Sequence, residues 1–328
     1  MSIKVGPIQI ADPVILAPMS GVSDLPFRRL VKRAGAGLVV SEMIASQAMI
    51  RESRQSLLMA RTEPEEFPMA VQLAGCEPAV MAEAAKLNED RGAAIIDINF
   101  GCPVKKVVNG HAGSALMRDE RHAGRILEAT VRAVSLPVTL KMRTGWDHAN
   151  RNAPRLARIA ESSGIRMITV HGRTRCQLYE GTADWEFLRE VKQAVAIPVI
   201  VNGDIVDLGG VRRALTLSGA DGVMIGRGAY GRPWFLRQAM AMLRGEPVPA
   251  DPTLAEQGAL VLEHYEAMLN HYGAGVGLRV ARKHVAWYSK GLPGSAEFRA
   301  AFNRIDEPGA AMAAIRSFYR PLLERQAA

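Results

Sequence analysis

The chain has 328 residues, of which 48% are hydrophobic and 23% are charged. This balance is typical of a folded globular protein and excludes intrinsic disorder and a collagen-like repeat. Lysine and arginine number 41 against 33 acidic residues, which gives a net charge of +8. Such a charge suits a polyanionic partner such as nucleic acid, and it also occurs in ordinary soluble enzymes.

Only three cysteines occur, too few for a disulfide framework in a chain of this length. The lack of Cys-X-X-Cys pairs and of Cys/His clusters predicts that the protein binds no metal. The sequence begins without the pattern of a secretory signal, and it contains no apolar run long enough to span a membrane. We therefore expect a cytoplasmic, monomeric protein with reduced thiols and no membrane contact.

Eight short apolar runs follow one another through the first 230 residues. Each is too short for a helix and too continuously apolar for a strand with one solvated face. Such runs are typical of parallel strands buried on both faces. The eight runs are 14–19, 37–43, 69–75, 95–101, 138–143, 167–173, 198–204 and 221–228.

Amphipathic segments separate these runs, and the clearest helix candidates are 26–35, 78–92, 121–134 and 185–195. Alternation of strands and helices predicts an α/β protein, specifically a (β/α)₈ TIM barrel, with a doubly wound open sheet as the alternative. The fourth and fifth strands begin 43 residues apart, at 95 and 138. This interval predicts a long loop at the end of the barrel where active sites form.

The strand pattern stops after about residue 245, at a proline-rich segment. We therefore predict a barrel domain over 1–245 and a small all-helical domain over 246–328. The helices expected in the second domain are 253–272, 277–290, 295–305 and 307–325.

Small residues end the seventh and eighth predicted strands, as Asn202-Gly203-Asp204 and Gly226-Arg227-Gly228. Loops after these two strands form the usual phosphate site of the barrel, because small residues let backbone N–H groups approach an anion. Arg227 would add positive charge. The pattern predicts a phosphate-bearing cofactor, while the alternative is that these glycines only form tight turns.

Three polar residues belong to otherwise apolar strands: Gln72, Lys141 and His171. A lysine is costly to bury unless it meets an anion, and a reduced flavin carries negative charge at one edge of its ring. An amide such as Gln72 could bind the pyrimidine edge of the same ring. Two alternatives stay open, because Lys141 could pair with Asp97 or Glu42 and His171 could be structural.

Cys102 lies between Gly101 and Pro103, where the long loop leaves the fourth strand. A free thiol has a pKa of about 8.5, so at neutral pH it is mostly protonated and can donate a proton. The alternative for any lone cysteine is a small buried hydrophobic residue. We assign that alternative to Cys76 and Cys176, and we predict a chemical role for Cys102.

Taken together, these motifs resemble the tRNA-dihydrouridine synthases, and most closely the bacterial B-type branch. The resemblance extends over roughly residues 8–320, with motifs in order at every strand. They are APMSGVSDLPFR (17–28), SEM (41–43), VQLAG (71–75), DINFGCPVKKVVNGHAGSALM (97–117), LKMRTGW (140–146), HGRTR (171–175), NGDI (202–205) and GADGVMIGRGAYGRPW (219–234).

The resemblance implies an enzyme that contains flavin mononucleotide (FMN) and uses NADPH or NADH to reduce the C5=C6 bond of uridines in the tRNA D-loop. Cys102 would be the proton donor, and Asn99 and Lys105 would contact the substrate. The target uridine must be unstacked or flipped to enter a barrel. The residues implied to bind FMN are Pro18, Met19, Ser20, Gln72, Lys141, His171, Asn202, Gly203, Asp204, Gly226 and Arg227.

A basic segment in the second domain suits the same substrate, because 276–305 contains six basic residues and one acidic residue. Trp287 and Tyr288 lie among these cations and could stack on bases. The alternative is a solvated helix face whose aromatic side chains point into the core. The cations predicted on one sector of a helix are Arg279, Arg282, Lys283 and Lys290.

Two other functions stay open at this point. An FMN barrel acting on a small pyrimidine or enone would share Lys141 and the phosphate loops but would not need the basic helical domain. A non-catalytic RNA-binding regulator would need neither Cys102 nor a flavin.

Overall fold

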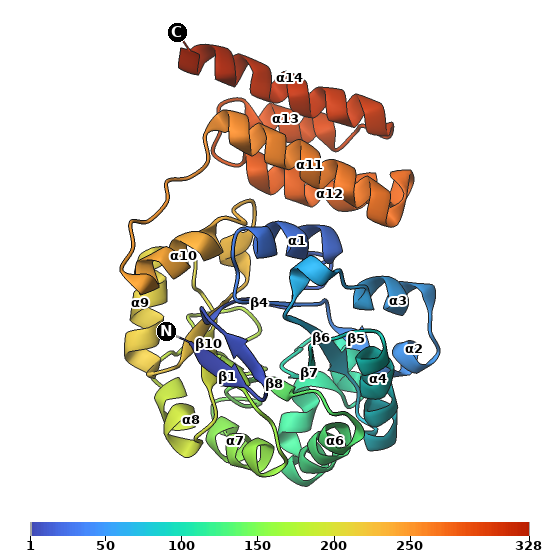
Figure 1. Ribbon diagram of the computed structural model, residues 1–328, viewed down its shortest axis with the longest axis vertical. Helices are drawn as coiled ribbons and strands as arrows, with labels where there is room; N and C mark the ends of the chain where they lie inside the picture. The colour runs from blue at the N-terminus through green and yellow to red at the C-terminus, as the bar shows by residue number, and fades with distance from the viewer. Residues whose placement is uncertain (1, 328) are drawn as a thin grey trace.

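The computed structural model describes residues 2–327, in which a ring of helices surrounds a parallel sheet and a separate layer of helices follows (Figure 1). The sheet closes because β3 pairs with both β4 and β11, and β4 pairs with β6. The predicted eight-stranded barrel is therefore confirmed. Its strands are β3 (Val14–Leu16), β4 (Leu38–Val40), β6 (Met69–Ala74), β7 (Ile95–Phe100), β8 (Val138–Arg143), β9 (Ile168–His171), β10 (Val199–Asn202) and β11 (Gly222–Ile225).

Helices pack outside the strands, as the amphipathic segments predict. Side chains fix where they begin: the Asp24 carboxylate accepts a hydrogen bond from the Phe27 N–H at 3.0 Å and starts α1. The surrounding helices are α1 (Leu25–Arg33), α4 (Pro78–Asp90), α6 (Glu120–Ala133), α7 (Ala153–Ser162), α8 (Leu188–Ala194), α9 (Leu208–Ser218) and α10 (Phe235–Arg244).

Several short elements were not predicted. β5 (Ile44–Ala45) extends the pairing on β6, and α2 (Ser46–Ile50) and α3 (Arg54–Ala60) follow it. The long loop after β7 contains α5 (Lys105–Asn109) before α6 begins. Three turns of 3₁₀ helix complete the barrel: η1 (Pro64–Glu66), η2 (Gly113–Arg118) and η3 (Arg227–Ala229).

An unpredicted antiparallel hairpin precedes the barrel, formed by β1 (Ile3–Val5) and β2 (Ile8–Ile10). Figure 1 shows it in dark blue across the middle of the ring. Its buried side chains Ile3, Val5 and Ile10 share an apolar cluster with residues from the amino ends of the barrel strands. The hairpin therefore closes the amino-terminal mouth of the barrel, and the opposite mouth is the one available for a site.

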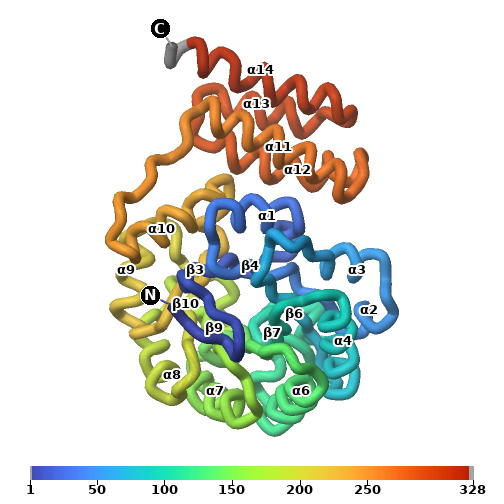
Figure 2. The backbone as a smooth tube through the Cα atoms, viewed as in Figure 1, coloured from blue at the N-terminus to red at the C-terminus, as the bar shows by residue number. Residues whose placement is uncertain are grey.

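Beyond α10, the chain runs without helix or strand to Thr253, whose hydroxyl starts α11 by accepting from the Glu256 N–H (Figure 2). Four helices follow, which confirms the predicted helical region. They are α11 (Leu254–Tyr272), α12 (Ala274–Ser289), α13 (Ser295–Phe302) and α14 (Pro308–Ala327). No helix within residues 2–327 is both long and apolar enough to cross a membrane.

The helical region rests on the barrel through α1 and the loop after β11 (Figure 2). The Tyr272 hydroxyl donates to the Asp24 carboxylate at 2.9 Å. The Trp287 ring stacks on Tyr230, with ring centroids 4.0 Å apart. Gly231 adopts a φ of +66°, and a Cβ there would lie 2.5 Å from the Trp287 carbonyl oxygen. These contacts fix helices α11 and α12 beside the open mouth.

Candidate active site

A cavity of about 600 Å³ lies at the carboxyl ends of the barrel strands. This is the face on which TIM barrels build their sites, and the volume is sufficient for a cofactor. Every residue predicted to bind FMN lines this cavity. They are Pro18, Met19, Ser20, Gln72, Lys141, His171, Asn202, Gly203, Asp204, Gly226 and Arg227.

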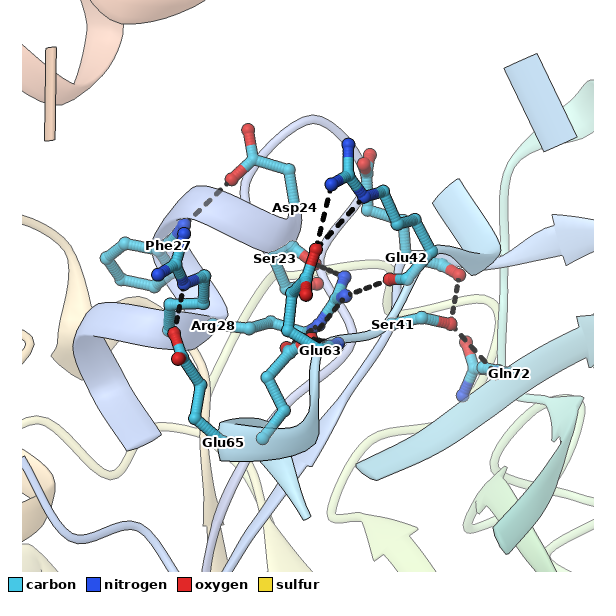
Figure 3. Close-up of polar contacts among 12 residues, drawn as sticks. Ser23, Asp24, Phe27, Arg28, Ser41, Glu42, Glu63, Glu65 and Gln72 are labelled. Carbon is cyan, nitrogen blue, oxygen red and sulfur yellow. Dashed lines mark hydrogen bonds and ion pairs between the residues drawn. The ribbon is translucent and has the colours of Figure 1, made fainter. Parts of the chain in front are cut away.

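A buried chain of hydrogen bonds forms one wall. The Asn99 amide donates to Gln72 Oε1 at 2.8 Å, and Gln72 Nε2 donates to the Asp97 carboxylate at 2.6 Å. The Thr139 hydroxyl also donates to Asp97. The Ser41 hydroxyl accepts from the Gln72 backbone N–H (Figure 3). The Gln72 amide is thereby held in one orientation, with one N–H and one lone pair left for a ligand.

Lys141 extends from β8 into the cavity, where its ammonium donates to Asn202 Oδ1 at 3.1 Å. It forms no direct ion pair with any described residue, so the structure does not support the alternative of a contact with Asp97 or Glu42, although the charge of the buried Asp97 raises the pKa of Lys141 in part. Burial and the neighbouring Arg143 lower the pKa of Lys141 to about 8. The result is an ammonium group facing the cavity without a carboxylate partner, which is an environment that favours an anionic ligand.

Cys102 stands at the start of the long loop, held by its backbone. Asn99 Oδ1 accepts from the N–H groups of Gly101 and Cys102 at 3.0 and 2.8 Å, and the Ser114 hydroxyl donates to the Cys102 carbonyl at 2.9 Å. Burial raises the pKa of the Cys102 thiol, so the group is protonated at neutral pH. Neither Cys76 nor Cys176 lines the cavity.

The phosphate loops lie at the other side of the cavity. Gly203 has a φ of +116°, and a Cβ there would lie 2.7 Å from His171 Cδ2, so a side chain is excluded. The Asp204 carboxylate accepts from both Arg173 and Arg227, at 2.6 and 2.8 Å. A carboxylate repels phosphate, so its contribution is to orient the arginines.

Electrostatics at this end favour anions. Burial, followed by the charges of Lys141 and several arginines, holds the pKa of His171 well below its ordinary value. His171 is therefore neutral at physiological pH, and the positive charge is carried by Lys141, Arg143 and Arg227.

Among the cavity residues missing from the predicted site are Arg143 and Tyr179. Arg143 follows Lys141 by two positions on β8 and so faces the same side of the strand, a signal that the sequence contained. Its Nε donates to the Gly101 carbonyl at 2.9 Å. Tyr179 belongs to an irregular loop, where no periodic pattern could have identified it.

Among the expected substrate contacts, Asn99 lines the cavity, whereas Lys105 is exposed on α5 outside it. Arg279 is exposed on α12, and Arg282 pairs with Asp306 at 2.9 Å. Lys283 was expected on the same exposed helix face, but it is half-buried.

The half-buried Lys283 contacts the barrel loop at Gly21, where a Cβ would lie 2.9 Å from its Nζ. Of the two interpretations given for Trp287 and Tyr288, the structure supports aromatic side chains that point into the protein over an exposed stacking surface. Trp287 packs on Tyr230, and Tyr288 is 2% exposed in the helical core, because α12 turns its aromatic face toward its neighbours.

A second cavity, of about 440 Å³, adjoins the first between η3 and the helical region. The two cavities share Arg227 and Tyr230, and Lys290 lines the second one at the end of α12. The charged residues that line this second cavity are Arg227, Arg232, Lys290 and Asp251. No cluster of three metal-ligating side chains occurs within residues 2–327.

Comparisons with known proteins add the following. The family model described as Dihydrouridine synthase (Dus) matches residues 15–322. A Rickettsia conorii protein named "Probable tRNA-dihydrouridine synthase" is 60% identical over 323 residues, covering 98% of each chain. A Pseudomonas aeruginosa protein named "tRNA-dihydrouridine synthase B" is 50% identical and covers 97% of this chain and 96% of that protein.

Among solved structures, a 2-naphthoyl-CoA reductase complex matches with a TM-score of 0.56 and 12% identity, over 75% of this chain. This chain covers about half of that one, 52%, and the likeness shows the fold alone.

Proposed function

Because the chain belongs to the dihydrouridine synthase family, we propose that it reduces uridines in the D-loop of tRNA to 5,6-dihydrouridine. Membership confirms the resemblance identified from the sequence motifs, including the likeness to B-type proteins. The observation that carries the proposal is the placement of a protonated thiol, Cys102, and an unpaired ammonium, Lys141, in one cavity of suitable size.

The family is flavin-dependent, and the residues present fit FMN. Lys141 supplies a cation that faces the cavity, and Gly203, Gly226 and Arg227 line the same cavity where the phosphate would lie. When bound, FMN would supply the hydride for C6 of uracil and would be reduced again by NADPH or NADH.

In this proposal each part of the cavity binds a different part of FMN. Pro18, Met19 and Ser20 would pack against the ring, and Gln72, Lys141 and His171 would contact its polar edge. Arg227 and the backbone of Asn202, Gly203 and Gly226 would hold the phosphate, with Asp204 orienting Arg227.

The chain's own contribution to the reaction is a proton. The Cys102 thiol would donate it to C5 of uracil and be reprotonated from solvent, so that the thiol is restored at each turnover. Asn99 fixes the thiol by accepting from the Cys102 N–H, and Arg143 lies nearby to bind a carbonyl of the base. The uridine would have to leave its stack to reach this depth.

The helical region would bind tRNA phosphates beside the barrel mouth. Arg279 and Lys290 are exposed, and neither is paired with an acidic side chain in the described part of the chain, so they and Lys105 suit phosphate contacts. Arg282 pairs with Asp306, and the half-buried Lys283 lies in the field of the Asp24 and Glu42 carboxylates, so both would contribute less. We propose that the enzyme acts as a monomer in the cytoplasm.

The experiment that tests this function is a nucleotide-resolved map of dihydrouridine in tRNA from cells that lack the gene. Wild-type and Cys102→Ala genes would each be returned to those cells. We expect loss of dihydrouridine at defined D-loop positions, restored by the wild-type gene alone. The function would be refuted if the map did not change on deletion and the purified enzyme were also inactive on transcribed tRNA that carries no dihydrouridine.

A further inference from the structure

The loop between β9 and α8, residues 172–187, is anchored by two buried arginines. Arg143 and Arg173 are each 2% exposed. Arg143 Nη1 donates to the carbonyls of Thr174 and Leu178, at 2.7 and 2.8 Å. Arg173 donates to the carbonyl of Glu180 at 3.0 Å and to that of Gly181 at 2.6 Å. A buried guanidinium needs its hydrogen bonds satisfied, so these contacts fix the loop backbone.

Arg173 also connects this loop to the loop after β10. Its two terminal nitrogens donate to the two oxygens of Asp204, at 2.9 and 2.6 Å. Asp204 accepts in addition from the Ala183 backbone N–H at 2.8 Å and from Arg227 at 2.8 Å. One carboxylate–guanidinium pair, made by the buried Arg173 and the partly exposed Asp204, therefore joins the loop 172–187 to the arginine proposed to bind phosphate.

Tyr179 lies between the two anchoring points. The carbonyls of its neighbours Leu178 and Glu180 are held by Arg143 and Arg173 respectively. Its ring is 60% exposed at the cavity mouth, and the guanidinium carbons of Arg143 and Arg227 lie 5.7 and 5.6 Å from its centroid. Because its ring is largely solvated, the position of Tyr179 depends mainly on the anchored backbone.

We propose that Arg173 and Asp204 are positioning residues that hold Tyr179 at the mouth, where its ring meets the incoming nucleotide, and link it to Arg227. The inference rests on the proposed function for the identity of that nucleotide. It predicts that tRNA binding weakens when the hydrogen bonds from Arg173 to the Glu180 and Gly181 carbonyls are lost, because Tyr179 is then no longer held in place. Arg173 itself does not touch the substrate in this proposal.

The test variant is Arg173→Lys, which retains a cation for Asp204 but cannot donate to Glu180 and Gly181 together. We expect the KM for tRNA to rise about tenfold to a hundredfold, with a smaller change in kcat and in FMN affinity. In a Tyr179→Ala background, Arg173→Lys should raise the KM for tRNA by less than about a third of the factor seen in wild type. The effects of two residues that act through one another are not additive.

A second measurement does not depend on activity. Chymotrypsin cleaves after exposed tyrosines, and anchoring should protect Tyr179 in the native FMN-bound enzyme. Cleavage after Tyr179 should be about tenfold faster in Arg173→Lys than in wild type. Asp204→Asn, which preserves shape but removes the charge, should also accelerate it if Arg173→Lys does not fold. Arg175→Lys is the matched control, because Arg175 lies over Trp146 and does not bind Asp204.

Additive effects of Arg173→Lys and Tyr179→Ala on the KM for tRNA would overturn the proposal, as would cleavage after Tyr179 at the wild-type rate. Wild-type enzyme that makes no dihydrouridine would refute the proposed function instead. The proteolysis result would then still decide whether Arg173 positions the loop.

Discussion

Replacement of Cys102 by alanine provides the sharpest test of the proposed chemistry. The thiol is half-buried, its raised pKa keeps it protonated, and the Cys102 backbone is fixed by Asn99 and Ser114. A positioned general acid contributes about 10²–10⁴-fold to rate, which corresponds to roughly 3–5 kcal/mol of barrier. Removal of the Sγ atom leaves the hydrogen bonds of the Cys102 backbone intact, so the loss should fall on the chemical step.

The size of the rate loss in Cys102→Ala depends on whether another group in the cavity can donate the proton instead. Lys141, with a pKa of about 8, is an acid of adequate strength at neutral pH, but its ammonium is bonded to Asn202 on another strand. We therefore expect a loss of at least about a hundredfold in Cys102→Ala. Cys102→Ser retains a donor and should lose less.

The assay is a single turnover in which prereduced enzyme is mixed with unmodified tRNA and flavin absorbance is followed. FMN content, tRNA affinity and the rate of reduction by NADPH should all match wild type. The wild-type rate should be constant through neutral pH and fall as the pH rises through the raised pKa of the thiol, because the deprotonated form cannot donate. Reoxidation of Cys102→Ala within about tenfold of wild type would refute the assignment.

Three further predictions follow from other contacts. Lys141→Met should lower the flavin reduction potential by about 30–60 mV, the equivalent of one charged hydrogen bond, in a spectroelectrochemical titration. An unchanged potential would contradict the role of its charge. Burial raises the pKa of Asp24 to about 6, so the folded chain binds a proton that the unfolded chain releases between about pH 4 and 6. The contribution of Asp24 to stability in urea should fall by roughly 3 kcal/mol as pH rises through that window. Asp24→Asn should remove that contribution and leave those of Glu42 and Asp97, whose pKa values burial also raises. Gly231→Ala should destabilise the protein in urea by at least about 1 kcal/mol more than Gly245→Ala. Both glycines have positive φ, but only at Gly231 would the added Cβ clash with the backbone of Trp287. Equal losses in both would show that the contact with Trp287 carries no energy.

The barrel could be predicted because its strands are buried on both faces and each produces a continuous apolar run. The hairpin β1–β2 could not, because three-residue strands carry too little pattern to distinguish them from an ordinary loop. The helices α2 and α3, of five and seven residues, escaped prediction for the same reason.

The site was predictable where its residues belong to strands, as Lys141 and Gln72 do, because their position along the strand places them toward one end of the barrel. Tyr179 was missed because its place depends on hydrogen bonds between buried arginines and loop carbonyls, which leave no periodic trace. The expected role of Trp287 failed for a related reason. The sequence shows that α12 is amphipathic, but only the packing against Tyr230 shows which face is covered.

The hairpin at the amino end has a kinetic consequence. Because it plugs one mouth of the barrel, the cavity is reached from the other. Under the proposed function, the nicotinamide of the reductant and the uracil of the substrate then use one entrance and one reactive ring, and they must take turns. Such an enzyme follows a double-displacement scheme, with parallel double-reciprocal plots and inhibition by excess tRNA competitive against the reductant. Catalytic throughput in the cell would then depend on the ratio of free tRNA to reduced nicotinamide rather than on either concentration alone.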